Sequence, residues 1–274
     1  FVKFGVTKIR LTGGEPLIRK DFPKILQTLS TLDVELSITS NAVSIDRHIE
    51  LLKKTGVKTV NISLDTLSAE RFHDITFRNY FDKVYQNILK LIDEGFKVKI
   101  NAVLMRGVND DEILDFIAFT KNHAVGFRFI EFMPFDGNQW KREKTVSYQE
   151  IMEQIKTAYS KDEIIRLQDA PNDTAKNYTI KGHRGTFAII STVTNPFCDQ
   201  CNRIRLTANG QLKNCLFSQK ENDLLTALRN QEDIEPIIRK NISSKFAVRS
   251  GMEGPEFEDP KKHQQNRSMI TIGG

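Results

Sequence analysis

The chain has 274 residues, 39% hydrophobic and 27% charged, which is ordinary for a globular protein and long enough for one large α/β domain or two smaller ones. Its net charge of +5 suits an anionic small ligand, and no arginine-rich run with interleaved aromatic residues indicates a nucleic-acid partner. No long apolar run indicates a membrane segment. An odd number of cysteines and no signal peptide predict a reducing, cytoplasmic compartment.

The first half of the chain alternates short β-rich runs with amphipathic helical patterns. The expected strands lie at 7–12, 35–41, 59–65, 97–104 and 126–133. Helical patterns separate them, and those at 80–95 and 110–123 carry apolar residues at i, i+3 and i+4, with Gly95 where a C-terminal cap belongs. Strands that alternate with helices predict βαβ units and a parallel sheet, either doubly wound or closed toward a barrel.

The pattern changes after a polar linker at 135–145. One helix is expected at 147–160, followed by β-rich runs, a cysteine-containing hairpin and two more helices, and the polar stretch 250–268 is expected to be loose. We therefore divide the chain into a domain at 1–140 and a second domain at 141–274.

All three cysteines fall in one window, FCDQCNRIRLTANGQLKNCLF, as Cys198, Cys201 and Cys215. Asn209-Gly210 between them predicts a two-residue type I′ hairpin, which would place Cys215 opposite Ile204. From the spacing alone three interpretations stay open: a structural zinc site, an iron–sulfur cluster with one open iron, and chance thiols. In the zinc interpretation, His183 or His263 would be the fourth ligand.

Several expected strands carry polar residues at alternate positions, where a parallel sheet is usually apolar. One face of each strand gathers the polar residues Lys8, Arg10 and Thr12; Asn61, Ser63 and Asp65; Lys97, Lys99 and Asn101; and Arg128. Solvated lysines on half-exposed strands are one explanation. Cations on successive strands favour the other, a polar interior that holds a polyanion such as a triphosphate.

The first expected strand ends in Gly13-Gly14-Glu15-Pro16. Two glycines allow a ligand to approach the backbone closely, and a carboxylate beside them can accept from an ammonium group. Taken alone, this run is more typical of a plain turn from a strand into a helix than of a ligand site. Active sites of parallel barrels lie at this carboxyl edge of the strands.

The run IRLTGGEPLIRKDF resembles the signature of the radical S-adenosylmethionine (SAM) superfamily. It is joined, in order along nearly the whole chain, by ITSN, VNISLDTL, FKVKINAVLMRGVND, RFIEFM, FCDQCNRIRL, KNCLF and the terminal pair Gly273-Gly274. Together these runs resemble the GTP 3′,8-cyclases of molybdenum cofactor biosynthesis. The resemblance favours a cluster over zinc.

The resemblance implies an α/β fold: a partial (βα)6 TIM-type barrel, N-terminally truncated here, and a C-terminal α+β domain that binds a [4Fe–4S] cluster and GTP. It implies a lyase in which SAM yields a 5′-deoxyadenosyl radical that abstracts hydrogen from the ribose of GTP. C3′ then joins C8, giving (8S)-3′,8-cyclo-7,8-dihydroguanosine 5′-triphosphate. The implied partners are an electron donor and the next enzyme, cyclic pyranopterin monophosphate synthase, and a homodimer is left open.

The resemblance also implies roles for individual residues. The expected SAM contacts are Gly14, Glu15, Ser63 and Met133, with Glu15 at the methionyl ammonium. The expected GTP contacts are Arg10, Thr39, Lys99, Arg128, Arg203, Ile204 and Arg205, with Lys8 as a further phosphate candidate and Arg203 and Arg205 as catalytic residues. Cys198, Cys201 and Cys215 would hold the second [4Fe–4S] cluster, whose open iron would meet the guanine. The pair Gly273-Gly274 would reach into the active site.

Two features conflict with this reading. A two-residue hairpin would turn Arg203 and Arg205 away from Cys215. The family's C-x3-C-x2-C motif, which binds the SAM-cleaving cluster, is also missing, and we interpret the start at Phe1 as a truncation. We therefore expect the printed chain to be inactive and to expose the edge of its first strand. The alternatives are a non-catalytic nucleotide-binding protein of the same fold, another radical SAM enzyme with an auxiliary cluster, and a zinc-stabilised interaction module.

Overall fold

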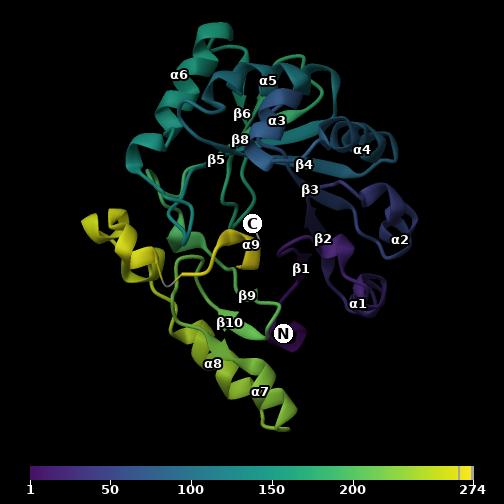
Figure 1. Ribbon diagram of the computed structural model, residues 1–274, viewed down its shortest axis with the longest axis vertical. Helices are drawn as coiled ribbons and strands as arrows, with labels where there is room; N and C mark the ends of the chain where they lie inside the picture. Colours follow the sequence, from purple (N-terminus) through teal and green to yellow (C-terminus); the bar gives the residue numbers. More distant parts are fainter. Residues whose placement is uncertain (265, 273–274) are drawn as a thin grey trace.

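The computed structural model describes residues 1–264 and 266–272, so the terminal glycine pair lies outside the described residues. Its main feature is a sheet in the order β1-β2-β3-β4-β5-β8-β7-β6 (Figure 1). The strands of this sheet are β1 Lys8–Leu11, β2 Glu35–Ser40, β3 Thr59–Ser63, β4 Lys97–Leu104, β5 Val125–Glu131, β6 Ile164–Arg166, β7 Lys176–Ile180 and β8 Thr186–Ile190. Neighbours from β1 through β5 to β8 pair in parallel, and β8, β7 and β6 pair antiparallel.

Helices follow the first five strands and cover one face of the sheet (Figure 1). They are α1 Phe22–Leu29, α2 Ile49–Lys54, α3 Ala69–Thr76, α4 Phe81–Asp93, α5 Ile113–Asn122 and α6 Tyr148–Ala158, with the 3₁₀ turns η1 Val2–Phe4, η2 Pro16–Ile18, η3 Ile45–Arg47, η4 Asp110–Glu112 and η5 Arg142–Lys144. The core forms on this face because alternate strand residues are apolar; Phe116 of α5 packs on Phe127 and Phe129 of β5, with ring centroids 4.9 and 5.9 Å away. The opposite face of the sheet, which we call the open face, carries the polar residues.

The five strands expected in the first half are confirmed, each within about two residues of its predicted ends. The two periodic helices are confirmed as α4 and α5, the latter preceded by the turn η4. Gly95 follows the C-cap of α4 with φ of 81°, a conformation that glycine adopts without strain. Local periodicity was sufficient here because each element is amphipathic and contacts its sequence neighbour.

The second half contributes to two sheets. Strands β6, β7 and β8 continue the main sheet, so this sheet crosses the boundary proposed at 140/141. A small sheet is formed by β9 Arg205–Leu206, β10 Gln211–Lys213 and β11 Asn222–Asp223, and it packs against α7 Leu224–Arg229 and α8 Glu235–Ser243. Phe1 and Phe4 of the N-terminal segment pack against the hydrophobic cluster of this region, which contains Leu212, Leu224 and Ile238.

The predicted hairpin register is wrong by one residue. Leu206 pairs with Leu212 and Arg205 with Lys213, which leaves three residues, 208–210, in the loop. Gly210 has φ of 79°, whereas Asn209 stays out of the left-handed region. The Oγ1 of Thr207 contacts Asn209 Oδ1 at 2.7 Å and accepts from the Gln211 amide at 2.9 Å, so side-chain bonding replaces the type I′ turn.

This shift removes the conflict over which way the arginines face. Side chains alternate along a strand, so a slip of one residue moves a whole set to the other face. Continuing the observed register places Cys215 in phase with Arg203, on the side that carries Arg205 and Lys213. Cys215 itself lies beyond the regular pairing.

The expectation that 250–268 is loose is wrong for the residues that the structure describes there. The 3₁₀ turns η7 Arg249–Gly251, η8 Pro255–Glu258 and η9 Pro260–His263 precede α9 Met269–Ile272, and η6 Cys198–Gln200 lies in the cysteine loop. Phe257 and His263 are buried against Phe217. Buried Asn266 accepts from the ammonium of Lys213 at 2.8 Å. The polar composition of this stretch did not predict that a few of its residues, Phe257, His263 and Asn266, would be buried.

Candidate active site

The open face of the sheet brings polar residues from successive strands into rows. Thr39, Asn61 and Lys99 are aligned in one row, and Ser63, Asn101 and Arg128 in the next. The rows form because parallel register places every second residue of neighbouring strands side by side.

Arg10, Lys99 and Arg128 place cations on this face. Desolvation, followed by repulsion from Arg128, lowers the pKa of Lys99 to about 8. Desolvation, followed by repulsion from Arg10, lowers the pKa of Arg128 to about 10. The side chain of Arg10 is partly exposed to solvent. Desolvation by the surrounding protein nevertheless lowers its pKa, and repulsion from Arg203 lowers it further. Asp173 attracts Lys99 and Arg128, and Glu35 attracts Arg10, but within the described residues none of these three cations forms an ion pair. The face therefore keeps a net positive charge.

Polar groups around these cations are only partly satisfied. Arg128 donates to Asn61 Oδ1 at 3.0 Å, and Asn61 donates onward to the Ile38 carbonyl at 3.0 Å. Within the described residues, the buried atoms Ser37 Oγ, Thr39 Oγ1 and Asn101 Oδ1 have no partner. An unsatisfied buried polar group costs about 1–3 kcal/mol, so these atoms are placed to receive a polar ligand or water.

Lys8 differs from the other cations. It stands at the start of β1 with its side chain half-exposed, and its ammonium pairs with Glu35 at 3.0 Å. An exposed pair of this kind contributes little to stability. Lys8 thus has a counterion already, and it is the weakest phosphate candidate of the set.

The turn after β1 contains Gly13 and Gly14, with φ of 87° and 49°. Glu15 follows and caps the turn η2, where its Oε1 accepts from the Leu17 amide at 3.1 Å. The same carboxylate accepts from Ser40 Oγ at 2.9 Å and from the Asn41 amide at 2.7 Å. Glu15 therefore ties the ends of β1 and β2 together, and a carboxylate with three donors retains room for one more.

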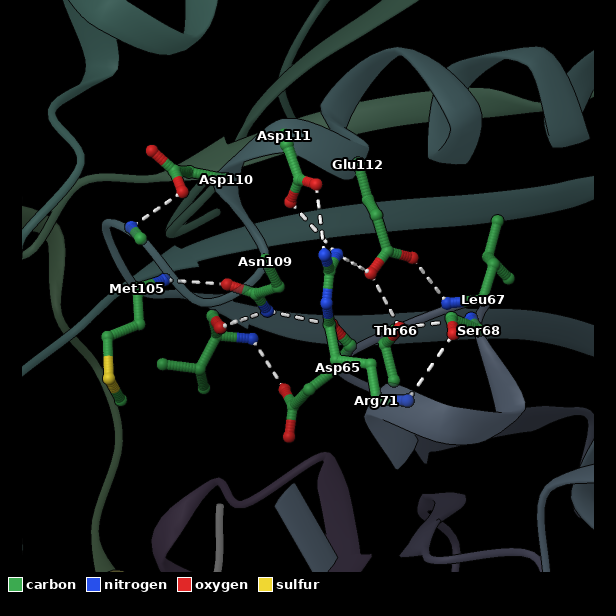
Figure 2. A network of polar contacts seen from close by, with 12 residues as sticks. Asp65, Thr66, Leu67, Ser68, Arg71, Met105, Asn109, Asp110, Asp111 and Glu112 are labelled. Carbon is green, nitrogen blue, oxygen red and sulfur yellow. Dashed lines mark hydrogen bonds and ion pairs between the residues drawn. The ribbon is translucent and has the colours of Figure 1, made fainter. Parts of the chain in front are cut away.

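The loops after β3 and β4 are fastened by a network shown in Figure 2. Asn109 donates to the carbonyls of Asp65 and Val103 at 2.7 and 2.9 Å and accepts from the Met105 amide at 2.8 Å. Glu112 accepts from Thr66 Oγ1 at 2.6 Å and from the Leu67 amide at 2.7 Å.

Arg71 of α3 completes the network by reaching Asp111 with two bonds of 2.9 Å and by contacting Glu112 (Figure 2). These contacts hold the strand ends that carry Ser63 and Asp65 in fixed positions.

Asp65 is the titratable group of this edge. Its Oδ1 accepts from the Val103 amide at 2.8 Å (Figure 2). Burial raises its pKa to about 6, although that amide opposes the shift. Sequence reasoning noted Asp65 at the strand end without giving it a role.

The predicted SAM contacts lie along the same edge. Ser63 ends β3 and is exposed, whereas Met133 lies two residues after β5, half-buried beside Phe132 and Phe135. Glu131, the last residue of β5, is fully buried.

Glu131 fastens the approach to the cysteines. Its Oε2 accepts from the amides of Val193 and Thr194 at 2.7 and 3.0 Å, and Oε1 from the Thr194 hydroxyl. Burial raises its pKa, and these bonds oppose the shift.

The three cysteines are free thiols and half-buried. The Cys201 thiol contacts Lys245 Nζ at 3.3 Å and an Arg203 guanidinium nitrogen at 3.6 Å. Burial raises the pKa of Cys201, but the charge of Arg203 and its backbone amide, with Lys245, outweigh burial and bring it to about 7.

The other two thiols have different surroundings. Cys198 accepts from the Arg249 amide at 3.4 Å. Burial raises the pKa of Cys215, with a further contribution from Cys198 and Cys201, so the three sulfurs lie near one another.

The segment Arg203-Ile204-Arg205 lies between the cysteines and the open face. Desolvation, followed by Arg203, lowers the pKa of Arg205 to about 10, while Cys201 and Cys215 oppose the shift and Arg10 adds to it. Arg203 lies over the Phe197 ring at 5.4 Å. The fold therefore brings the predicted arginines of the two halves, Arg10 and Arg203 with Arg205, within electrostatic range.

The residue types at this site are those that bind an iron–sulfur cluster. Three neighbouring thiols lie beside two cationic side chains, Arg203 and Lys245, which stabilise thiolates. In the described part of the chain, no three such side chains are already arranged around a single metal ion. A cluster attaches each thiolate to a different iron, so its ligands are spaced more widely than those of one zinc ion.

Neither histidine considered for zinc contacts the cysteines in the structure. His183 hydrogen-bonds Thr120 Oγ1 at 2.9 Å just before β8 begins, whereas the cysteines follow the end of β8. The Nε2 of His263 meets the Phe257 carbonyl at 2.7 Å.

Lys245 and Arg249, the tail residues that contact cysteines, were missed in the sequence. No short sequence pattern could have predicted these contacts, because Lys245 lies 44 positions from Cys201 and Arg249 lies 51 positions from Cys198. Only the tertiary structure reveals them.

A mostly parallel sheet with a polar face at its carboxyl edge defines a partial α/β barrel. Residues 1–120 match the Radical SAM superfamily and residues 125–250 match the family described as Molybdenum Cofactor Synthesis C. Among solved structures, Streptococcus suis SuiB bound to S-adenosylmethionine aligns with a TM-score of 0.57 and 15% identity, over 96% of this chain and 62% of that chain. This likeness shows the fold.

Closer relatives identify the family. The chain is 44% identical to the mitochondrial GTP 3′,8-cyclase of Arabidopsis thaliana, over 100% of this chain and 70% of that protein. It is 41% identical to the GTP 3′,8-cyclase of Listeria monocytogenes, over 100% and 83%. The chain therefore belongs to the GTP 3′,8-cyclase family of radical SAM enzymes.

The chain spans only part of some relatives. It is 42% identical to molybdenum cofactor biosynthesis protein 1 of Bos taurus over 99% of this chain but 43% of that protein. Among the described residues, no helix is long and apolar enough to cross a membrane.

Proposed function

We propose that this chain forms the GTP-binding and cluster-binding part of an enzyme that converts GTP to (8S)-3′,8-cyclo-7,8-dihydroguanosine 5′-triphosphate, the first step of molybdopterin biosynthesis. One observation carries the proposal. Arg10 and Arg128 of the open face lie within electrostatic range of Arg203 and Arg205, which belong to the cysteine segment (residues 198–215). Repulsion from another of these four arginines contributes to the lowered pKa of Arg10, of Arg128 and of Arg205. None of the four forms an ion pair within residues 1–264 and 266–272.

Like charges gathered without ion-pair partners are costly unless a ligand supplies the opposite charge. A nucleoside triphosphate does so, because its phosphates accept charge-assisted hydrogen bonds from guanidinium and ammonium groups. Lys99 adjoins this group, and Thr39 offers an unpartnered hydroxyl beside it. Ile204 lies between the two arginines and would contact the nucleoside. The guanine would then point to the cysteines.

The turn at Gly14 and Glu15 fits the other ligand. Its glycines permit close approach of a ligand to the backbone, and Glu15 can accept once more, from the methionyl ammonium of SAM. Ser63 and Met133 stand at the ends of β3 and β5 on the same edge. A (βα) barrel places its active site at this edge.

A bound cluster and SAM would supply the radical that removes hydrogen from the ribose. The role of the chain is positional: the arginines would hold the triphosphate and Cys198, Cys201 and Cys215 would hold a cluster with an open iron. The printed sequence contains three cysteines, all in this segment. We therefore expect the 274 residues alone to bind GTP and one cluster without turnover. An electron donor and a cyclic pyranopterin monophosphate synthase are the proposed partners.

The test is anaerobic reconstitution with iron and sulfide, followed by iron, sulfide and zinc analysis and by calorimetric titration with GTP. We expect about four irons and four sulfides per chain, no zinc, and GTP binding that weakens in Cys215→Ser together with loss of the cluster. One zinc without iron, or a reconstituted chain that does not bind GTP, would contradict the proposal.

A further inference from the structure

Lys245 lies two residues beyond the end of α8. All three hydrogen-bond donors of its ammonium group are directed at the cysteine segment. Its ammonium donates to the Cys201 carbonyl at 2.6 Å, to the Arg203 carbonyl at 3.1 Å and to the Cys201 thiol at 3.3 Å. An ammonium has three donors, so none is left for another partner. A half-buried lysine committed in this way is more specific than a solvated surface charge.

The three thiols are supported unequally. Cys201 faces two cationic side chains, Lys245 and Arg203, whereas Cys198 is contacted by a backbone amide. Cys215 is contacted by no side-chain donor in the part of the chain that the structure describes. The electrostatic support is therefore concentrated on the one cysteine that adjoins the Arg203-Ile204-Arg205 segment.

We propose that Lys245 is a positioning residue that raises the reduction potential of the cluster and fixes the segment carrying Arg203. The inference rests on the proposed function, because it needs the cluster on these cysteines. A positive donor to a ligand sulfur stabilises the reduced cluster, which carries one more negative charge. The bonds to the two carbonyls hold that sulfur and the backbone of Arg203 in one arrangement, as partners of metal ligands commonly do.

The competing explanation is a purely structural staple for the end of α8. Both explanations predict some loss of stability when the side chain is shortened. They differ in the potential, because only a charged donor at the thiolate changes the energy of the added electron. Reduction potential is therefore the deciding readout.

The experiment compares Lys245→Met, Lys245→Gln and Lys240→Met in the reconstituted 274-residue chain. Lys240 is an exposed lysine on α8 whose side chain contacts none of the three thiols within the described residues, so its variant controls for net charge. The cluster is titrated with dithionite while its paramagnetic reduced form is followed by electron paramagnetic resonance. Iron release to a chelator and GTP affinity are measured alongside.

We expect Lys245→Met to lower the potential by about 59 mV, a tenfold shift of a one-electron equilibrium. Iron release should be about 10- to 100-fold faster, and GTP should bind more weakly. Lys245→Gln, which keeps a donor without charge, should fall between Met and wild type, and Lys240→Met should match wild type.

Equal potentials in Lys245→Met and Lys240→Met would overturn the inference while leaving the proposed function intact. If Lys245→Met assembles no cluster, Lys245→Gln decides: an unchanged potential in that variant overturns the inference. Zinc in the wild type, or failure of the wild type to bind a cluster, would overturn both.

Discussion

The open face of the sheet and the cysteine segment hold the two halves of the candidate site by different means. On the open face, Thr39, Asn61 and Lys99 are aligned by backbone hydrogen bonds between parallel strands. In the cysteine segment, Cys201 and Arg203 lie outside regular pairing and are held by Lys245. The first arrangement follows from a repeating register, and the second depends on single side chains far away in sequence.

This contrast has an energetic consequence. A strand residue is held by many bonds, so the loss of one neighbour disturbs its position little. A loop residue held by one ammonium or one carboxylate moves when that group is lost, and Glu131 plays this role for 193–194. Variants in the cysteine segment should therefore affect ligand geometry more than variants on the open face.

The largest effect is expected for Arg205→Ala. Arg205 joins both halves, because it faces Cys201 and Cys215 and also repels Arg10. A charge-assisted contact contributes about 1.5–3 kcal/mol, so GTP affinity should fall about 10- to 100-fold by calorimetry. Arg229→Ala, at an exposed end of α7, is the control. Equal affinities of the two variants would exclude Arg205 from the GTP site.

Gly210→Ala should break the hairpin that places the cysteines. Its φ of 79° disfavours a side chain, and an added Cβ would lie 2.3 Å from Leu225 Cβ of α7. We expect a loss of about 1–3 kcal/mol of unfolding free energy, measured by urea denaturation, and slower cluster assembly.

Gly182→Ala separates the two causes of this loss. Gly182 has φ of 85°, but an added Cβ there would meet nothing within 4 Å. The Gly182 variant should therefore be the milder one. Equal losses in both variants would show that packing on α7 does not determine the hairpin.

Lys99→Met tests the open face through pH. Since desolvation and Arg128 lower the pKa of Lys99 to about 8, the free protein loses this charge as the pH rises from 7.5 to 9. Phosphate binding favours the ammonium form, so wild-type GTP affinity should fall over this range, by at most about tenfold.

Lys99→Met should bind more weakly at pH 7.5 and depend less on pH. The ionisation of GTP itself is common to all proteins in the comparison and cancels. Lys90→Met, at an exposed position of α4, should retain the wild-type profile. A Lys99→Met profile that parallels the wild type would place Lys99 away from the phosphates.

The smallest effect is expected from Asp65→Asn, measured as the pH dependence of the free energy of unfolding. The folded pKa of about 6 lies above the ordinary value of 3.8, so between these values the folded state holds a proton that the unfolded state lacks. The contribution of Asp65 to the free energy of unfolding is thus fully present below about pH 4, and it is lost as the pH rises through about 6.

Asn keeps an acceptor for the Val103 amide without a charge. Urea denaturation at pH 4.5 and pH 7.5 should therefore show the variant gaining on the wild type as the pH rises. A constant difference between the two proteins would mean that Asp65 does not titrate in this window.

Much of the barrel half was predictable. The strands at 35–41 and 97–104, the helix over 80–95 and the capping role of Gly95 followed from periodicity and composition. The polar rows were predictable as well, because alternation along a strand fixes which residues share a face, and parallel pairing aligns neighbouring strands.

For the cysteine segment, the sequence predicted which residues take part but not how they are arranged. The sequence motif named the three cysteines, yet the expected two-residue turn put Arg205 and Cys215 on opposite faces. The contacts of Thr207 with Asn209 and Gln211 produced a three-residue loop instead. A slip of one residue reverses the faces of a strand, so a small local difference decided the orientation of the site.

The sequence by itself determined the alternation of strands and helices, the polar face of the sheet and the family to which its motifs point. These properties are local, since they depend on neighbours in the chain and on regular repeats. Only the tertiary structure decided that Arg205 shares a face with Lys213 and that Lys245 closes on Cys201. Such contacts form between residues distant in sequence, and their energies compare whole packed arrangements, which no short pattern records.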